Sequence, residues 1–236
     1  DWLPTLGKEH ANGKKPAAYD MTGYNQAEEG AGLYWQDRSN KDFGYDVYYV
    51  AKREDRGTRA KYYKEGDHPD THTAGVRLLP KFTDTLSGEF EGAVQVGSES
   101  LLAGQAYGGV TYAPKASWKP YLTGACWYLS GDSAGGRGNN AWHAVFNRET
   151  GMGEAVAPMY TKYDYTNLLY PHLAAGVQLA DACAIDAECG PMFTPVTEAN
   201  PKGGDYGDHR GFYGKVKYTI PLGKVVGSWA HGGKLA

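Results

Sequence analysis

Glu89 and Glu91 are the first pair of residues whose types and spacing suggest chemistry. Two carboxylates two positions apart on a strand point to the same side, and such a pair resembles the acid and the nucleophile of a glycosidase. That reaction needs one carboxyl group to stay protonated inside an apolar pocket, and the surrounding sequence offers none. We therefore expect these acids to line a wet surface, and we predict that the protein is not an enzyme.

The glycine-rich segment 131–136, with the sequence GDSAGG, is the second candidate for chemistry. It resembles the nucleophile loop of trypsin-like proteases, but an additional alanine interrupts the glycine turn, and the distant His231 follows Ser133 instead of preceding it. It is not a phosphate-binding loop either, because no Gly-Lys-Ser/Thr follows. We predict a loop that folds inward as a constriction, with Asp132 capping the turn and Arg137 beside it.

The three cysteines are too few and too irregularly spaced for a disulfide scaffold or a structural zinc site. Cys183 and Cys189 are a candidate loop disulfide in an oxidising compartment, whereas Cys126 lies in a strand-like segment as a packed thiol. A metal site at Cys183 and Cys189 would have to be completed by Asp181, Asp186 and Glu188. We predict no metal and no cofactor.

Composition and charge narrow the class of protein. The 236 residues include 33 glycines and 19 tyrosines, well above ordinary usage, and 41% hydrophobic residues are enough to form a fold. The formal net charge of −3 indicates no basic surface for nucleic acid, so we predict no nucleic-acid partner. A mean hydropathy of −0.57 without long apolar runs excludes a helical membrane protein, but not a barrel of alternating strands.

Period-two alternation is the strongest pattern in the chain. In residues 85–97 one parity carries glycine and apolar side chains, and the other carries carboxylates, serine and glutamine. A helix would scatter both sets around its circumference, whereas a strand sorts them onto two faces. Similar segments predict nine antiparallel strands near residues 29–38, 43–54, 72–79, 85–97, 102–113, 119–130, 154–163, 168–179 and 212–221. The segment 154–163 is included to keep the antiparallel order and to leave 180–211 as a long loop.

The lengths of these segments and of their connections favour a membrane-spanning barrel. The strands run to about ten residues, close to what a tilted strand needs to cross a bilayer. Short connections alternate with long ones, as in outer-membrane barrels. Tyrosines and tryptophans gather near strand ends, as expected of rings at a lipid headgroup belt. The alternative is a soluble, lectin-like sandwich, which would bury its apolar face against a second sheet.

Several segments together resemble the alginate-export family of outer-membrane porins. They are HTAGVR at residues 72–77, GEFEGAVQVG at 88–97, YLSGD at 128–132 and AWHAVF at 141–146, with DVYYVAKREDR at 46–56 ahead of them. The resemblance covers about residues 30–146. It implies an all-β, antiparallel transmembrane barrel of about eighteen strands, of which this chain supplies about nine or ten as the C-terminal half.

A half barrel would leave two unpaired edges in lipid, so the remaining strands of the same barrel are an expected partner. Residues 1–236 are then one partial barrel domain, and we expect the polypeptide to continue, because the end GGKLA lacks a terminal aromatic strand. The alternative is a complete, small closed barrel of about eight to ten strands with a filled lumen and an adhesin or structural role.

Under the barrel interpretation, one parity of the strands lines the pore. The pore-lining, solute-contacting candidates are Arg38, Asp46, Tyr48, Lys52, Arg77, Glu89, Glu91, Gln95 and Tyr107. The family resemblance implies an arginine-rich lumen that passes an anionic uronic-acid polymer, and this mixture of acids and bases departs from it. The charges could instead pair across neighbouring strands and only hydrate the interior.

Together these patterns predict a porin of the bacterial outer membrane. Its function would be passive passage of hydrophilic solutes, chiefly acidic sugars or oligosaccharides of the alginate type, and its partners would be membrane lipid and the saccharide. An outer-membrane hydrolase is a less favoured alternative, since it requires a nucleophile or carboxylate site that the sequence does not show.

Overall fold

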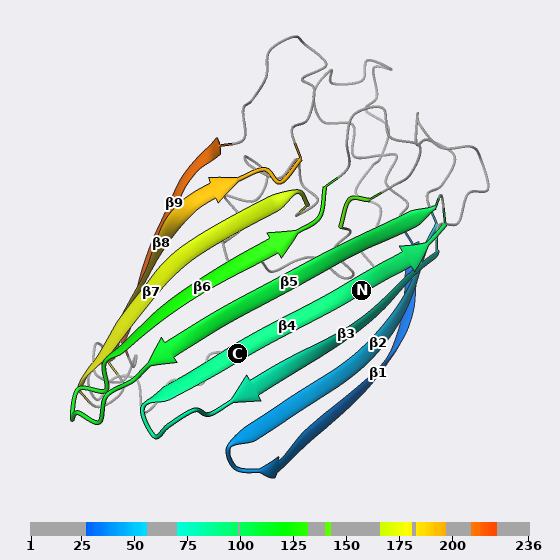
Figure 1. Cartoon of the computed structure of the whole chain (residues 1–236). Coiled ribbons are helices and arrows are strands. Elements are labelled where there is room, and N and C mark those ends of the chain that lie inside the picture. The colour runs from blue at the N-terminus through cyan, green and yellow to red at the C-terminus, as the bar shows by residue number, and fades with distance from the viewer. Residues whose placement is uncertain are drawn as a thin grey trace, which may run out of the picture.

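A computed structural model describes residues 27–55, 70–98, 100–131, 140–142, 166–180, 183–196 and 209–220. They form nine strands in a single antiparallel sheet, in which each strand is hydrogen-bonded to the next in sequence (Figure 1). The strands are β1 (Ala27–Asn40), β2 (Phe43–Asp55), β3 (Asp70–Pro80), β4 (Leu86–Gly97), β5 (Leu101–Tyr112), β6 (Tyr121–Leu129), β7 (Leu168–Ala180), β8 (Cys183–Phe193) and β9 (His209–Thr219). No helix among the described residues is long and apolar enough to span a membrane.

Eight of these strands lie within three residues of the segments in which alternation predicts them. The exception is β8, which occupies part of the segment 180–211 that the sequence analysis treats as a loop. The predicted strand at 154–163 lies outside the described residues. Its expected place between β6 and β7 in the sheet is wrong, however, because β6 pairs directly with β7. The strand that the antiparallel order requires is β8, which follows β7.

Short and long connections alternate between the two ends of the sheet, as the sequence predicts. Residues 41–42, 81–85, 113–120 and 181–182 connect strands at one end, which we call the tight-turn end. Residues 56–69, 98–100, 130–167 and 194–208 connect them at the opposite, long-loop end. All but one of the long-loop connections are longer than any at the tight-turn end.

One face of the sheet, the outer face, is apolar and exposed. Leu33 and Val216, near opposite edges of the sheet, are each 76% exposed, and Leu173 in β7 is 59% exposed. The register keeps this face continuous, since Leu33 pairs with Tyr49, and Leu173 with Cys189. No described residue covers it, so the second sheet that a soluble sandwich would require is not found in this part of the chain.

The other face, the inner face, is polar and concave. Gln105 on β5 donates a hydrogen bond of 3.3 Å to the Tyr48 hydroxyl on β2, three strands away. Side chains that far apart in the sheet meet because it curls toward them, and Figure 1 shows β1 and β9 turned toward the same side. The sheet is nevertheless open, because β1 and β9 are not paired with each other.

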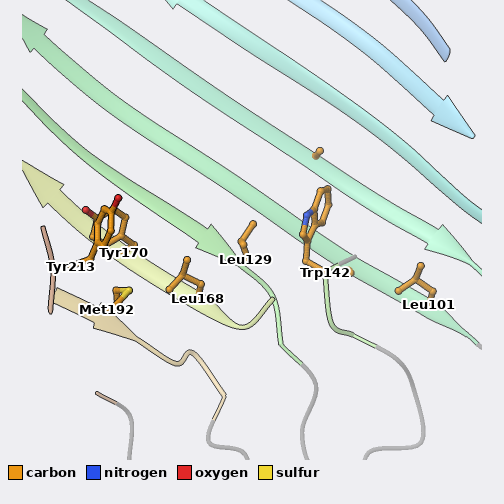
Figure 2. Packing of buried hydrophobic residues seen from close by; sticks show 9 residues of the cluster. Leu101, Leu129, Trp142, Leu168, Tyr170, Met192 and Tyr213 are labelled. Atoms are coloured by element: carbon orange, nitrogen blue, oxygen red, sulfur yellow. The ribbon is translucent and has the colours of Figure 1, made fainter. Parts of the chain in front are cut away.

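A small apolar cluster lies on the inner face toward the long-loop end (Figure 2). It combines residues from six strands, β4 to β9, with Trp142, from the connection between β6 and β7. The buried members are Ala93, Leu101, Ala103, Leu129, Trp142, Leu168, Tyr170, Met192 and Tyr213. The fold therefore buries its few large apolar side chains at one end of the concave side, while the longer apolar rows of the outer face stay uncovered.

The carbonyl of Ser130 holds the ends of the β6–β7 connection in place. It accepts hydrogen bonds from the backbone nitrogens of Trp142 and Asn167, both at 3.0 Å, and from the Thr166 hydroxyl at 2.9 Å. Asn167 has a positive φ of 54°, a conformation that asparagine tolerates better than most residues. The buried side-chain amide of Asn167 donates to the Val196 carbonyl at 2.8 Å and accepts from the Val196 backbone N–H at 2.9 Å. These two bonds join the β6–β7 connection to the β8–β9 connection.

Candidate functional site

The residues predicted to line a pore all lie on the inner face of β1–β5. The register sets several of them in one row, since Asp46 pairs with Arg77, and Arg77 with Glu91. Tyr107 extends this row onto β5 as the partner of Glu91. The remaining candidates share the face: Arg38, Tyr48, Lys52, Glu89 and Gln95.

Arg77 is the centre of an ion-pair network that links three strands. Its Nη2 and Nε atoms lie 2.6 and 2.8 Å from Oε1 of Glu89, and its Nη1 atom lies 3.8 Å from Oδ2 of Asp46. Asp46 is 0% exposed and also pairs with Arg38, Nη2 to Oδ1, at 2.5 Å, while the Tyr34 hydroxyl donates to Oδ2 at 2.9 Å. A buried carboxylate is tolerated only when it is compensated, and these groups compensate Asp46.

Glu91 is held differently, by neutral donors. The Tyr48 hydroxyl donates to its Oε1 atom at 2.6 Å, and the Gln105 amide donates to the same oxygen at 3.0 Å. No cation lies within ion-pair distance of Glu91 among the described residues, although Arg77 is its partner in the register. Glu91 therefore has no ion-pair contact among the described residues, although Arg77 is near enough to attract its charge, and its hydrogen bonds all end on Oε1.

Tyr48 reaches Glu91 by lying across Gly75. A Cβ atom built on Gly75 would overlap the Cζ and hydroxyl atoms of the Tyr48 ring. We expect Gly75→Ala to lower the free energy of unfolding by about 1–3 kcal/mol, because the ring must move and release Glu91. Denaturant titration of protein refolded in detergent measures this loss.

Gly92→Ala is the matched control for that variant. Gly92 faces outward on the neighbouring strand, and the nearest atom to an added Cβ is the Gln105 carbonyl oxygen at 4.0 Å. We expect a change within about 0.5 kcal/mol. Equal losses in both variants would contradict the view that Tyr48 needs the space above Gly75.

The strands β6–β9 add an arrangement that the sequence analysis missed. The Tyr121 hydroxyl donates to Oδ1 of Asp186 at 2.8 Å, and the Tyr170 hydroxyl donates to Oε1 of Glu188 at 3.0 Å. Lys215 lies 3.1 Å from the other oxygen of Glu188. The signal was present in the sequence of β8, where the two acids alternate with Ile185, Ala187 and Cys189.

A groove of about 380 Å³ lies between these two sets of residues, across β4 to β9 of the inner face. It combines carboxylates with aromatic rings: Glu89, Glu91, Glu188, Tyr107, Trp127 and Tyr170. Tyr107 and Trp127 are direct cross-strand partners and pack edge to face, with ring centroids 5.9 Å apart. Tyr170 and His172 are stacked with centroids 4.4 Å apart. Such a surface offers both hydrogen-bond acceptors and flat apolar faces.

The predicted disulfide between Cys183 and Cys189 is wrong. Both residues lie on the single strand β8, six positions apart, and are free thiols. Six strand residues span about 20 Å, whereas a disulfide requires Cα atoms within about 7 Å. No group of three or more His, Cys, Asp or Glu residues in the described part of the chain is arranged to hold a metal ion.

The predicted constriction residues Asp132 and Arg137 lie outside the described residues. From the same connection, Trp142 is only 6% exposed and packs into the apolar cluster at the long-loop end (Figure 2). Its backbone is fixed by Ser130, whose side-chain hydroxyl also donates to the Asn140 carbonyl at 2.7 Å. Part of the connection therefore does lie against the inner face.

The aromatic residues near strand ends divide between the two faces. The residues that the sequence predicts for a lipid headgroup belt are Tyr34, Trp35, Tyr48, Tyr49, Tyr112, Trp118, Tyr121, Trp127 and Tyr128. The prediction is wrong for Tyr34, Tyr48, Tyr121 and Trp127, which point inward. Two members of the predicted set, Tyr112 and Trp118, are exposed at the tight-turn end, together with Phe43 and Phe82. Polar groups accompany this set, and a hydrogen bond from Lys115 at 2.7 Å holds the pKa of Asp84 below its usual value.

Among the side chains that the structure describes, the charges of the inner face are balanced. Five of these described side chains are basic, Arg38, Lys52, Arg77, Lys215 and Lys217, and five are acidic, Asp46, Glu89, Glu91, Asp186 and Glu188. Cross-strand pairing, the alternative raised by the sequence, accounts for Arg77 with Glu89 and for Arg38 with Asp46. The described part of the inner face is therefore not an arginine-rich surface.

No protein-family model, curated protein or solved structure matches this chain. The resemblance to alginate-export porins stays a prediction from the motifs.

Proposed function

We propose that this protein is a channel of the bacterial outer membrane, and that its nine strands form part of the wall of a transmembrane β-barrel. The observation that carries the proposal is the arrangement of the two faces: apolar outside and uncovered, polar inside and concave. In water, such large apolar rows would be buried, whereas lipid tails would cover them in a bilayer. Hydrophilic solutes would pass along the inner face.

The dimensions of the sheet support a bilayer environment. The strands run from 9 residues in β6 to 14 in β1, and about 9–11 residues suffice for a tilted strand to cross. The exposed aromatic rings at the tight-turn end lie where a headgroup belt would contact a barrel. Water would reach the inner face, where the ion pairs and the groove lie.

The strand count indicates what is needed to close the barrel. In an antiparallel sheet of nine consecutive strands, β1 and β9 run in the same direction. Antiparallel closure therefore requires an odd number of further strands. Closure matters because each backbone N–H or C=O group left unpaired at an open edge in lipid would cost several kcal/mol. Nine more strands, as the family resemblance implies, satisfy this condition. A small barrel closed by these nine strands alone does not.

The solute that we propose is a hydrophilic saccharide. Carboxylates, hydroxyls and aromatic rings along the inner face are groups that bind sugars, and the resemblance adds acidic sugars of the alginate type. A hydrolase is less well supported, because Glu89 is held by Arg77, and Glu91 by Tyr48 and Gln105. We therefore propose passage without chemistry.

Conductance in planar bilayers tests the proposal. The full-length protein is reconstituted, and current is recorded with and without oligosaccharides in the bath. We expect stable unitary conductance steps that saccharides interrupt. Inserted protein that conducts no ions, at any voltage that the bilayer tolerates, would refute the channel.

A further inference from the structure

We propose that the inner-face groove is a subsite for an uncharged pyranose unit, and that it disfavours the sugar acid that the family resemblance implies. The inference rests on the proposed channel function and concerns which saccharide this part of the wall receives. Three features carry it: a row of aromatic residues, hydrogen-bonding atoms open to a ligand, and the charge of Glu91.

The aromatic row follows directly from the strand register. Glu91 pairs with Tyr107, Tyr107 with Trp127, and Trp127 with Tyr170, so one line of side chains crosses β4, β5, β6 and β7. His172 stacks on Tyr170 at the far end of the groove. The faces of pyranose rings present C–H groups that pack on aromatic side chains. Because Tyr170 is only 2% exposed, Tyr107 and Trp127 are the rings of this row that offer contacts to a sugar.

The hydrogen-bonding atoms are complementary to sugar hydroxyls. Among the described residues, the hydrogen bonds to Glu89 and Glu91 all end on Oε1, which leaves both Oε2 atoms without a hydrogen-bond partner there. Indole Nε1 of Trp127 likewise has no partner in this part of the chain and is not buried. A hydroxyl group can donate to the first two and accept from the third.

The charge of the groove discriminates between sugars. Arg77 compensates Glu89, and Lys215 compensates Glu188. Glu91 lies at the start of the aromatic row and is bound only by the neutral donors Tyr48 and Gln105. A uronate seated on the row would bring a second negative charge close to Glu91, whereas a neutral pyranose would bring none.

Two hexamers that differ only at C6 test this inference: β-1,4-linked mannohexaose and the corresponding mannuronate hexamer. Each is added to the full-length protein in planar bilayers, and the dissociation constant is obtained from the duration and frequency of current blocks. We expect mannohexaose to block more tightly. In Trp127→Ala we expect its dissociation constant to rise at least about tenfold, with the unitary conductance retained as the sign of a folded channel.

Tyr128→Ala is the matched control, because Tyr128 is the next residue on β6 and faces outward. We expect it to leave the mannohexaose block unchanged. Glu91→Gln keeps an acceptor for Tyr48 and removes the charge, so we expect tighter binding of the mannuronate hexamer with little change for mannohexaose. The inference is overturned if the mannuronate hexamer blocks the unaltered protein more tightly, or if Trp127→Ala leaves the block unchanged. Either result leaves the channel itself intact, whereas absence of any conductance would refute the channel.

Discussion

Leu173→Arg should prevent or strongly weaken insertion of this protein into lipid vesicles. Leu173 lies in the middle of β7 on the outer face and is 59% exposed. An arginine facing hydrocarbon near the bilayer midplane of a barrel costs about 2–4 kcal/mol. Denaturant-induced unfolding from lipid vesicles measures this loss, with tryptophan fluorescence as the signal.

Ala174→Arg is the control, one residue further along the same strand. Ala174 faces inward and is paired with Glu188, so an arginine there meets water and a carboxylate. We expect a loss of less than about 1 kcal/mol. If the outer face were in contact with water, Leu173→Arg would change stability by no more than about 0.5 kcal/mol, and equal small effects of both variants would contradict the membrane assignment.

Arg77→Glu should shift ion selectivity toward cations. The substitution changes the charge of the wall by −2 and removes the partner of Glu89 and one of the two cations near Asp46. A cleft lined by one sign of charge concentrates counter-ions, so we expect the ratio of cation to anion permeability to rise by roughly threefold or more. Reversal potentials across a salt gradient measure it.

A double variant separates the effect of charge from that of structure. Arg77→Gln combined with Glu89→Gln removes both members of the ion pair and leaves the net charge of the wall unchanged. We expect its ion selectivity to match that of the unaltered protein. Unchanged selectivity in a folded, conducting Arg77→Glu channel would instead mean that Arg77 does not face the permeation path.

The faces of the strands could be predicted from sequence because alternation has a period of two. The inward position of Glu89 and Glu91 and the outward position of Phe90 follow from it directly. The strand β8 escaped prediction because Gly190 and Pro191 interrupt its pattern and two cysteines suggested a loop. Without β8, the antiparallel order predicts a strand before β7 instead of after it, and Asp186 and Glu188 fall in a loop instead of on the inner face.

The sequence by itself determined which side chains share a face, since that depends only on strand parity. The tertiary structure decided which of them meet. Tyr48, Glu91 and Gln105 come together from β2, β4 and β5 through hydrogen bonds that join residues up to 57 positions apart. Such contacts depend on register and on curvature, which are properties of strands paired with one another, and neither can be read from any one segment.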